Sequence, residues 1–119
     1  MKNILVIDDD KDILEAIEML LSTEGYNSQS STGGEDIYKL VNTYNPDLII
    51  LDVLLSGSDG RNICKDLKMN KNTKEIPVLM ISAHPSAMQS VIDVGANNFL
   101  AKPFNTDRFL SEIKKLLIT

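Results

Sequence analysis

The stretch NILVIDDDKD, residues 3–12, joins an apolar run directly to three acidic residues. The four consecutive apolar side chains at residues 4–7 are typical of a strand that is buried on both faces, as in a parallel sheet. Asp8, Asp9 and Asp10 follow at once, and carboxylates this close repel one another, the more so where water is partly excluded. The stretch therefore predicts a buried strand that ends at a site where positive charge must compensate the aspartates.

Short apolar runs recur along the chain and alternate with stretches of helical periodicity. Strands are predicted at 4–7, 26–30, 48–51, 78–81 and 99–101. Apolar residues at helical spacing mark helices at 13–21, 37–44, 63–67, 88–92 and 109–117. The first helix has Asp9 or Asp10 as its N-cap and Gly25 as its stop. A strand followed by a helix, five times over, predicts an α/β fold with a doubly wound five-stranded parallel sheet and helices on both faces.

Composition limits the classes of function. With 119 residues and 43% apolar content, the chain predicts one domain, residues 1–119. Its net charge of −5 disfavours binding to nucleic acid or to an anionic membrane surface. No apolar run approaches the roughly 20 residues that cross a bilayer, and no signal peptide is visible, so a cytoplasmic location is expected. The lone Cys64 is expected to be a buried side chain on a helix.

Polar residues follow four of the predicted strands. Asp8 and Asp9 follow the first, Asp52 the third, Ser82 the fourth and Lys102 the fifth. Because the carboxyl ends of parallel strands share one edge of the sheet, these side chains are expected to converge there. Clustered carboxylates suit Mg²⁺, which prefers oxygen ligands and offsets their repulsion. A carboxylate beside this metal can attack a phosphoryl group, whose oxygens an ammonium and a hydroxyl would stabilise.

Five segments together resemble the receiver domains of response regulators in two-component phosphorelay signalling. They are ILVIDDD (4–10), PDLIILDVLL (46–55), SDG (58–60), PVLMISA (77–83) and GANNFLAKPF (95–104). They occur in order and at receiver spacing, and they cover essentially the whole chain. The resemblance extends to the chemotaxis regulators and implies the strand order 2-1-3-4-5 of a flavodoxin-like sheet.

The resemblance also implies a role for each residue of the site. Asp52 is the phosphoacceptor. Asp8 and Asp9 form the acidic pair that binds Mg²⁺ together with Asp52 and the backbone carbonyl of Leu54. Lys102 pairs with the phosphoryl group and is expected to precede a cis peptide bond to proline. Phosphorylation of an aspartate is thus the expected chemistry.

Further positions bear on switching and on the lifetime of the phosphorylated state. By resemblance, Ser82 is the switch hydroxyl and Phe99 the aromatic residue whose rotamer follows phosphorylation. Leu54 and His84 occupy the two positions that modulate hydrolysis, and neither belongs to the acid–amide pair of a fast-hydrolysing receiver. A long-lived phosphorylated state is therefore expected.

The leading interpretation is a phosphorylation-dependent signalling switch. A sensor histidine kinase or phosphotransfer protein supplies the phosphoryl group, and the face made by the fourth helix, the fifth strand and the fifth helix changes population. The chain catalyses only its own phosphorylation and dephosphorylation, so no enzyme with a separate substrate is predicted. The expected output is a downstream protein target or an effector domain absent from this chain, without direct contact to nucleic acid or membrane.

The expected assembly state is a monomer or a weak dimer. Winged-helix transcription-factor receivers dimerise through an aspartate before the switch aromatic and an arginine on the fifth helix. Asn98 and Glu112 occupy the equivalent positions here. Because neither side chain is basic, that charge pair cannot form across a dimer axis.

Two alternatives stay open. A phosphohydrolase of the haloacid-dehalogenase type also forms an aspartyl phosphate, at the end of its first strand and with a second aspartate two residues on. Asp8 and Asp10 fit that spacing loosely, although 119 residues leave little room for a cap. The second alternative is a degenerate receiver that acts as an unphosphorylated binding module, and the complete acidic set argues against it. Turnover of a generic phosphomonoester separates the hydrolase from the switch.

Overall fold

Strands and helices alternate along the chain in the order that the periodicity predicts. A computed structural model describes residues 2–33, 37–55 and 57–118. The strands are β1 (Asn3–Ile7), β2 (Asn27–Ser31), β3 (Leu48–Asp52), β4 (Leu54–Leu55), β5 (Ser58–Asp59), β6 (Val78–Ser82) and β7 (Asn98–Ala101). The helical elements are α1 (Lys11–Thr23), α2 (Ile37–Tyr44), α3 (Gly60–Met69), the 3₁₀ turn η1 (Pro85–Ala87), α4 (Met88–Asp93) and α5 (Thr106–Leu117).

Five strands form one parallel sheet in the order β2-β1-β3-β6-β7. This is the predicted order 2-1-3-4-5, because the short β4 and β5 form a separate two-stranded sheet. The central strands β1, β3 and β6 are apolar and buried almost throughout, as their unbroken runs predict. The edge strand β2 is polar, NSQSS, and begins one residue later than predicted. An edge strand tolerates this composition because less of its surface is covered.

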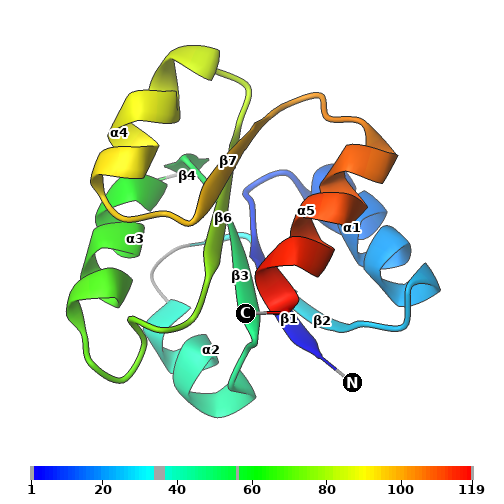
Figure 1. Ribbon diagram of the computed structural model, residues 1–119, viewed down its shortest axis with the longest axis horizontal. Helices are drawn as coiled ribbons and strands as arrows, with labels where there is room; N and C mark the ends of the chain where they lie inside the picture. Colours follow the sequence, from blue (N-terminus) through cyan, green and yellow to red (C-terminus); the bar gives the residue numbers. More distant parts are fainter. Residues whose placement is uncertain (1, 34–36, 56, 119) are drawn as a thin grey trace.

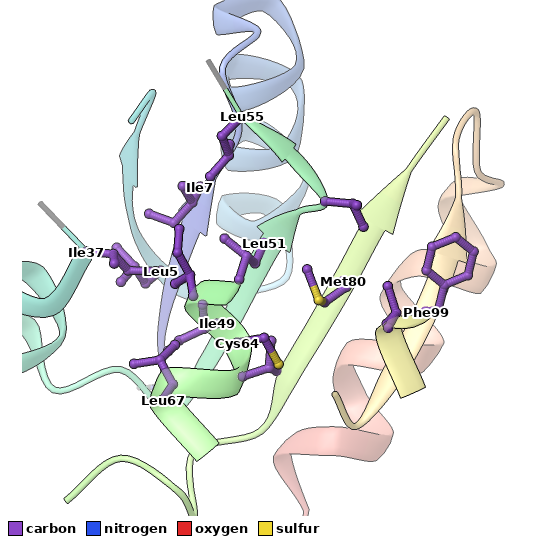
Figure 2. Packing of buried hydrophobic residues seen from close by; sticks show 14 of the residues in the cluster. Leu5, Ile7, Ile37, Ile49, Leu51, Leu55, Cys64, Leu67, Met80 and Phe99 are labelled. Carbon is purple, nitrogen blue, oxygen red and sulfur yellow. The ribbon is translucent and has the colours of Figure 1, made fainter. Parts of the chain in front are cut away.

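Helices cover both faces of the sheet. Figure 1 shows α2, α3 and α4 on one face and α1 and α5 on the other. Side chains of a strand alternate between the two faces, so Leu5 and Ile7 pack in one apolar layer and Ile4 and Val6 in the other. Figure 2 shows the first of these layers, where Cys64 of α3 lies buried among strand and helix side chains. The predicted helical core position of this cysteine is confirmed.

The ends of α1 are set by local hydrogen bonds and one glycine. Asp10 is the N-cap, and its carboxylate accepts the backbone amides of Asp12 at 2.9 Å and Ile13 at 3.3 Å. Gly25 follows the helix with φ of +82°, a conformation that L side chains rarely adopt. Of the two predicted caps, Asp10 is therefore the one that serves the helix. Asp9 does not cap the helix and lies at the carboxyl edge of the sheet.

The segment between β3 and α3 folds back as a small hairpin that the periodicity did not predict. Leu54 of β4 pairs with Asp59 of β5 in antiparallel register. The amide of Gly60 then donates to the carbonyl of Val53 at 2.7 Å. A Cβ atom at Gly60 would lie 2.0 Å from the carbonyl oxygen of Asp52, so only glycine fits there. The hairpin holds the start of α3 directly against the end of β3.

Candidate functional site

Three carboxylates meet at the carboxyl edge of the sheet. Asp8 follows β1, Asp9 is the next residue, and Asp52 ends β3. Each offers a carboxylate oxygen, and these atoms all lie within 4.8 Å of one another. Asp8 and Asp52 are buried, whereas Asp9 is exposed. The convergence predicted from the strand ends is present, although the sequence separates Asp52 from the pair by more than 40 residues.

Lys102 bridges the two buried carboxylates. Its ammonium Nζ lies 2.8 Å from Oδ2 of Asp8 and 3.2 Å from Oδ2 of Asp52. The side chain is held in place because the Lys102 amide donates to the carbonyl of Ser82 at 2.7 Å, beside the end of β6. The Lys102–Pro103 peptide bond is cis, as expected. Lys102 therefore supplies part of the compensating positive charge that the three aspartates require.

The charges of this cluster shift each other's proton affinities. Burial is the largest cause that raises the pKa of the Asp52 carboxyl, and the neighbouring charge of Asp8 adds to the rise. The Lys102 ammonium and the backbone amide of Leu54 lower that pKa without cancelling the rise. Burial alone would lower the pKa of Lys102, but hydrogen bonds and charge from Asp8 and Asp52 outweigh it and raise that pKa. The charged form of Asp52 is thus disfavoured in the fold.

The other predicted residues of the site differ in how close they lie to the carboxylates. Ser82 ends β6 and is buried, and its hydroxyl accepts the backbone amide of His84 at 3.0 Å. Leu54 lies beside the acceptor strand with its side chain half exposed and its amide bonded to the Asp52 carboxylate. Phe99 instead packs into the apolar layer of Figure 2, with 6% of its surface exposed. The fold therefore places Phe99 in the core and not among the carboxylates.

A second polar group borders the site and was not predicted from the sequence. Arg61, in the first turn of α3, forms an ion pair with Asp59 at 2.7 Å and donates to the Ser90 hydroxyl at 3.1 Å. A cavity of about 180 Å³ lies here, and its lining includes Arg61, Leu54 and Ser82. The acidic N-cap position of Asp59 is readable from the sequence, but the contact with Ser90 is not, because it joins two helices.

Replacing Asp52 by asparagine should raise the melting temperature of the metal-free protein at neutral pH by several degrees. The folded state raises the pKa of this carboxyl, so its contribution to stability is present below the unfolded-state pKa and lost as the pH rises through the folded-state pKa. At neutral pH the native carboxylate therefore costs stability, and Lys102 keeps Asp8 as a partner in Asp52→Asn. The measurement is thermal unfolding with a chelator present, from about pH 8 down to about pH 4.

The difference between Asp52→Asn and the native protein should shrink as the pH falls. Asp12→Asn is the matched control, because Asp12 is an exposed carboxylate in the first turn of α1. Its loss should lower stability slightly, by weakening the interaction with the helix dipole. A melting temperature of Asp52→Asn below that of the native protein at neutral pH would contradict the prediction.

Comparison with known proteins agrees with this geometry. The sequence profile of the response regulator receiver domain matches residues 4–114. A protein assigned as a response regulator from Chloroflexus aurantiacus J-10-fl is 33% identical, with 99% of this chain and 98% of that chain covered and a TM-score of 0.94. The receiver domain of NtrX from Brucella abortus is 35% identical, with 98% of each chain covered and a TM-score of 0.89. The chemotaxis protein CheY4 of Vibrio cholerae is 28% identical, with 98% and 99% covered and a TM-score of 0.90.

The chain belongs to the response regulator receiver domain family of two-component systems. Members of this family are signalling switches and not enzymes that act on a separate substrate, and they bind Mg²⁺ through acidic residues. They interact with histidine kinases and effector domains. Within residues 2–33, 37–55 and 57–118, no helix has the length and apolar character needed to span a bilayer.

Proposed function

We propose that this chain is a switch that a histidine kinase or a phosphotransfer protein phosphorylates on Asp52 in the cytoplasm. The observation that supports this most directly is the buried Asp52 carboxylate, which Lys102 bridges to Asp8. A nucleophile needs an unprotonated oxygen, and the ammonium provides a fixed positive charge beside it. A phosphoryl group adds negative charge to a site where three carboxylates already face one ammonium, so its acceptance requires a further positive charge.

Mg²⁺ is the cofactor that we propose for this site. The donor set fits it, because Asp8, Asp9 and Asp52 offer hard carboxylate oxygens within 4.8 Å of one another. The backbone carbonyl of Leu54, two residues beyond Asp52, is the proposed fourth protein ligand. When bound, the metal supplies charge stabilisation to a phosphoryl oxygen.

Asp52, Lys102 and Ser82 have separate roles in the proposed phosphoryl transfer. An Asp52 carboxylate oxygen attacks phosphorus, a P–O or P–N bond to the donor breaks, and the donor departs with that electron pair. The Lys102 ammonium stabilises one oxygen of the transferred group, and the Ser82 hydroxyl donates to another after leaving its present orientation. The burial of Asp52 and Ser82 keeps bulk water away from the new bond.

The proposed output is a change in the face formed by α4, β7 and α5. Movement of Ser82 toward the phosphoryl group would free space at the end of β6. Phe99 of the neighbouring strand β7 lies in the same apolar layer as Met80 of β6 and Val91 of α4. The face exists in two arrangements before phosphorylation. Phosphorylation then raises the population of one arrangement at the expense of the other. A downstream protein, or an effector domain beyond this chain, would read the difference.

Transfer from acetyl phosphate tests the proposal. Incubation of the native protein with acetyl phosphate and Mg²⁺ should add one phosphoryl group, measured by intact mass. A chelator should abolish the addition, and Mg²⁺ alone should raise the melting temperature by offsetting the repulsion of the carboxylates. Turnover of acetyl phosphate or of a generic phosphomonoester, without accumulation of the phosphorylated chain, would instead favour the phosphohydrolase.

Activation should not produce a salt-bridged dimer. The Asn98 side chain donates a hydrogen bond to the Glu112 carboxylate of the same chain, and Lys115 lies 3.6 Å from that carboxylate. Only 14% of the Glu112 side chain is exposed, so it is engaged within its own chain. An acidic residue facing a second acidic surface is repelled. Sedimentation of the beryllofluoride complex should therefore show a monomer or a weak dimer at micromolar concentration.

A positive control for that experiment is the double variant Asn98→Asp/Glu112→Arg, which installs the missing charge pair on β7 and α5. This variant should associate more strongly than the native chain, and its association should weaken with added salt. A tight native dimer that dissociates steeply as salt is added would contradict the prediction.

A further inference from the structure

Arg61 connects the hairpin behind the acceptor to helix α4. Its guanidinium donates to the Asp59 carboxylate through Nη2 at 2.7 Å and Nε at 2.9 Å. These hydrogen bonds lower the pKa of the Asp59 carboxyl below its ordinary value. The remaining nitrogen, Nη1, donates to the Ser90 hydroxyl of α4 at 3.1 Å. The Ser90 hydroxyl in turn donates to the carbonyl of Ala87 at 2.9 Å. Two successive hydrogen bonds therefore connect the guanidinium to the η1 turn.

Asp59, the anchor of Arg61, is part of the acceptor loop hairpin. Asp59 pairs with Leu54, which lies only two residues beyond Asp52 in the hairpin. Asp59 also caps α3 by accepting the Arg61 amide at 2.9 Å. Any displacement of the loop after Asp52 is therefore passed to the guanidinium, because the fork-like ion pair fixes the Arg61 side chain to Asp59.

A cavity lies beside the η1 turn, from which α4 starts. Residues of the acceptor loop, of the start of α3 and of the η1 turn line the cavity of about 180 Å³, among them Leu54, Arg61 and Ala87. Helix α4 has six residues and starts directly from η1, without a side-chain cap. A helix of this length without a side-chain cap has little intrinsic stability. One hydrogen bond from a charged donor can therefore determine where the helix lies.

We propose that the Arg61–Ser90 hydrogen bond is a latch that holds α4 in the arrangement of the unphosphorylated protein and so opposes phosphorylation. The inference rests on the proposed function of Asp52, because recruitment of Ser82 by the phosphoryl group draws the segment 82–87 across the cavity. That motion carries Ser90 away from a guanidinium that stays bound to Asp59. Arg61 is a positioning residue, and removal of either partner of the latch favours the activated arrangement.

The test is the affinity of beryllofluoride with Mg²⁺, measured by calorimetry on the native protein, Ser90→Ala, Arg61→Gln and the double variant. Each single variant should bind about three- to tenfold more tightly, the equivalent of one ordinary intramolecular hydrogen bond, because the Arg61 side chain is partly exposed to water. The double variant should bind no more tightly than the tighter single one, because the Arg61–Ser90 hydrogen bond is already absent from each single variant. Ser86→Ala is the matched control: it removes a hydroxyl from the same cavity wall and leaves the latch intact.

The latch and the proposed function fail in distinguishable ways. Absence of beryllofluoride binding by the native protein would contradict the function of Asp52. Native binding with equal or weaker affinity in Ser90→Ala and Arg61→Gln would overturn the latch alone. A second measurement needs no phosphoryl analogue: NMR relaxation dispersion of the amides 83–93 should show more exchange in both single variants than in Ser86→Ala. Unchanged dispersion would also overturn the latch.

Discussion

Asp52→Asn should accept no phosphoryl group from acetyl phosphate, while the native chain accepts one. The amide oxygen of asparagine lacks the charge and the nucleophilicity of the Asp52 carboxylate. Within residues 2–33, 37–55 and 57–118, no second carboxylate ends β3 beside Lys102. Asp8 is buried against Lys102 and also accepts the Asp10 amide at 2.9 Å, so both of its oxygens are engaged. The expected effect is complete loss of the mass increase that one phosphoryl group causes.

The control for this experiment is Asp12→Asn, which removes an exposed carboxylate close in sequence to the acidic pair but outside the cluster. It should be labelled like the native protein. Thermal unfolding of Asp52→Asn, which should be more stable than the native chain, shows that loss of labelling is not loss of folding. Labelling of Asp52→Asn at the native level, mapped by mass spectrometry to Asp8 or Asp9, would contradict the assignment and favour the phosphohydrolase.

Leu54→Asn should shorten the life of the phosphorylated state by about 10- to 100-fold, which reaches the lower end of the roughly 10²- to 10⁴-fold effect of a positioned proton-transfer group. The Leu54 amide bonds the Asp52 carboxylate, and Leu54 lines the same cavity as Ser82 and is 48% exposed, so a polar side chain at this position can hold an attacking water. Leucine offers no hydrogen bond and shields the phosphoryl group from solvent. The native phosphorylated protein should therefore be long-lived for a receiver.

The measurement is the decay of the acyl phosphate after removal of the donor, in native protein, Leu54→Asn and Leu54→Met. Methionine keeps the apolar character and nearly the volume of leucine, so Leu54→Met should decay at about the native rate. If asparagine leaves the decay rate unchanged, the side chain at Leu54 does not control hydrolysis. If methionine accelerates decay as much as asparagine, shielding by shape and not water positioning controls the rate.

Local patterns predicted most of the fold. The apolar runs at 48–51 and 78–81 lie within β3 and β6, and the run at 4–7 within β1, because a strand covered on both faces has no polar side. The strand at 26–30 was one residue early, since a polar edge strand carries almost no periodic signal. The hairpin β4–β5 was missed for a different reason: strands of two residues are too short to show a period.

The approach of the site residues to the sheet edge was also predictable, because parallel strands all end on the same side. Strand ends alone placed Asp8, Asp9 and Asp52 together, and the structure brings their oxygens within 4.8 Å of one another. The roles assigned to these residues, to Ser82 and to Lys102 came from resemblance to a family and stay predictions. Local sequence left Asp9 and Asp10 equivalent as helix caps, and only the hydrogen bonds of the α1 amides distinguish them.

By itself, then, the sequence determined the order of the elements, the buried strands and the set of groups at one edge, since each has a local signature in polarity and spacing. Tertiary structure alone decided that Lys102 spans Asp8 and Asp52 together, and that Arg61 reaches Ser90 across 29 positions of the chain. Such contacts leave no trace in neighbouring residues, because the distance between two side chains on different elements depends on how those elements pack. The charge balance of the acceptor and the proposed latch on α4 are therefore properties of the packed molecule.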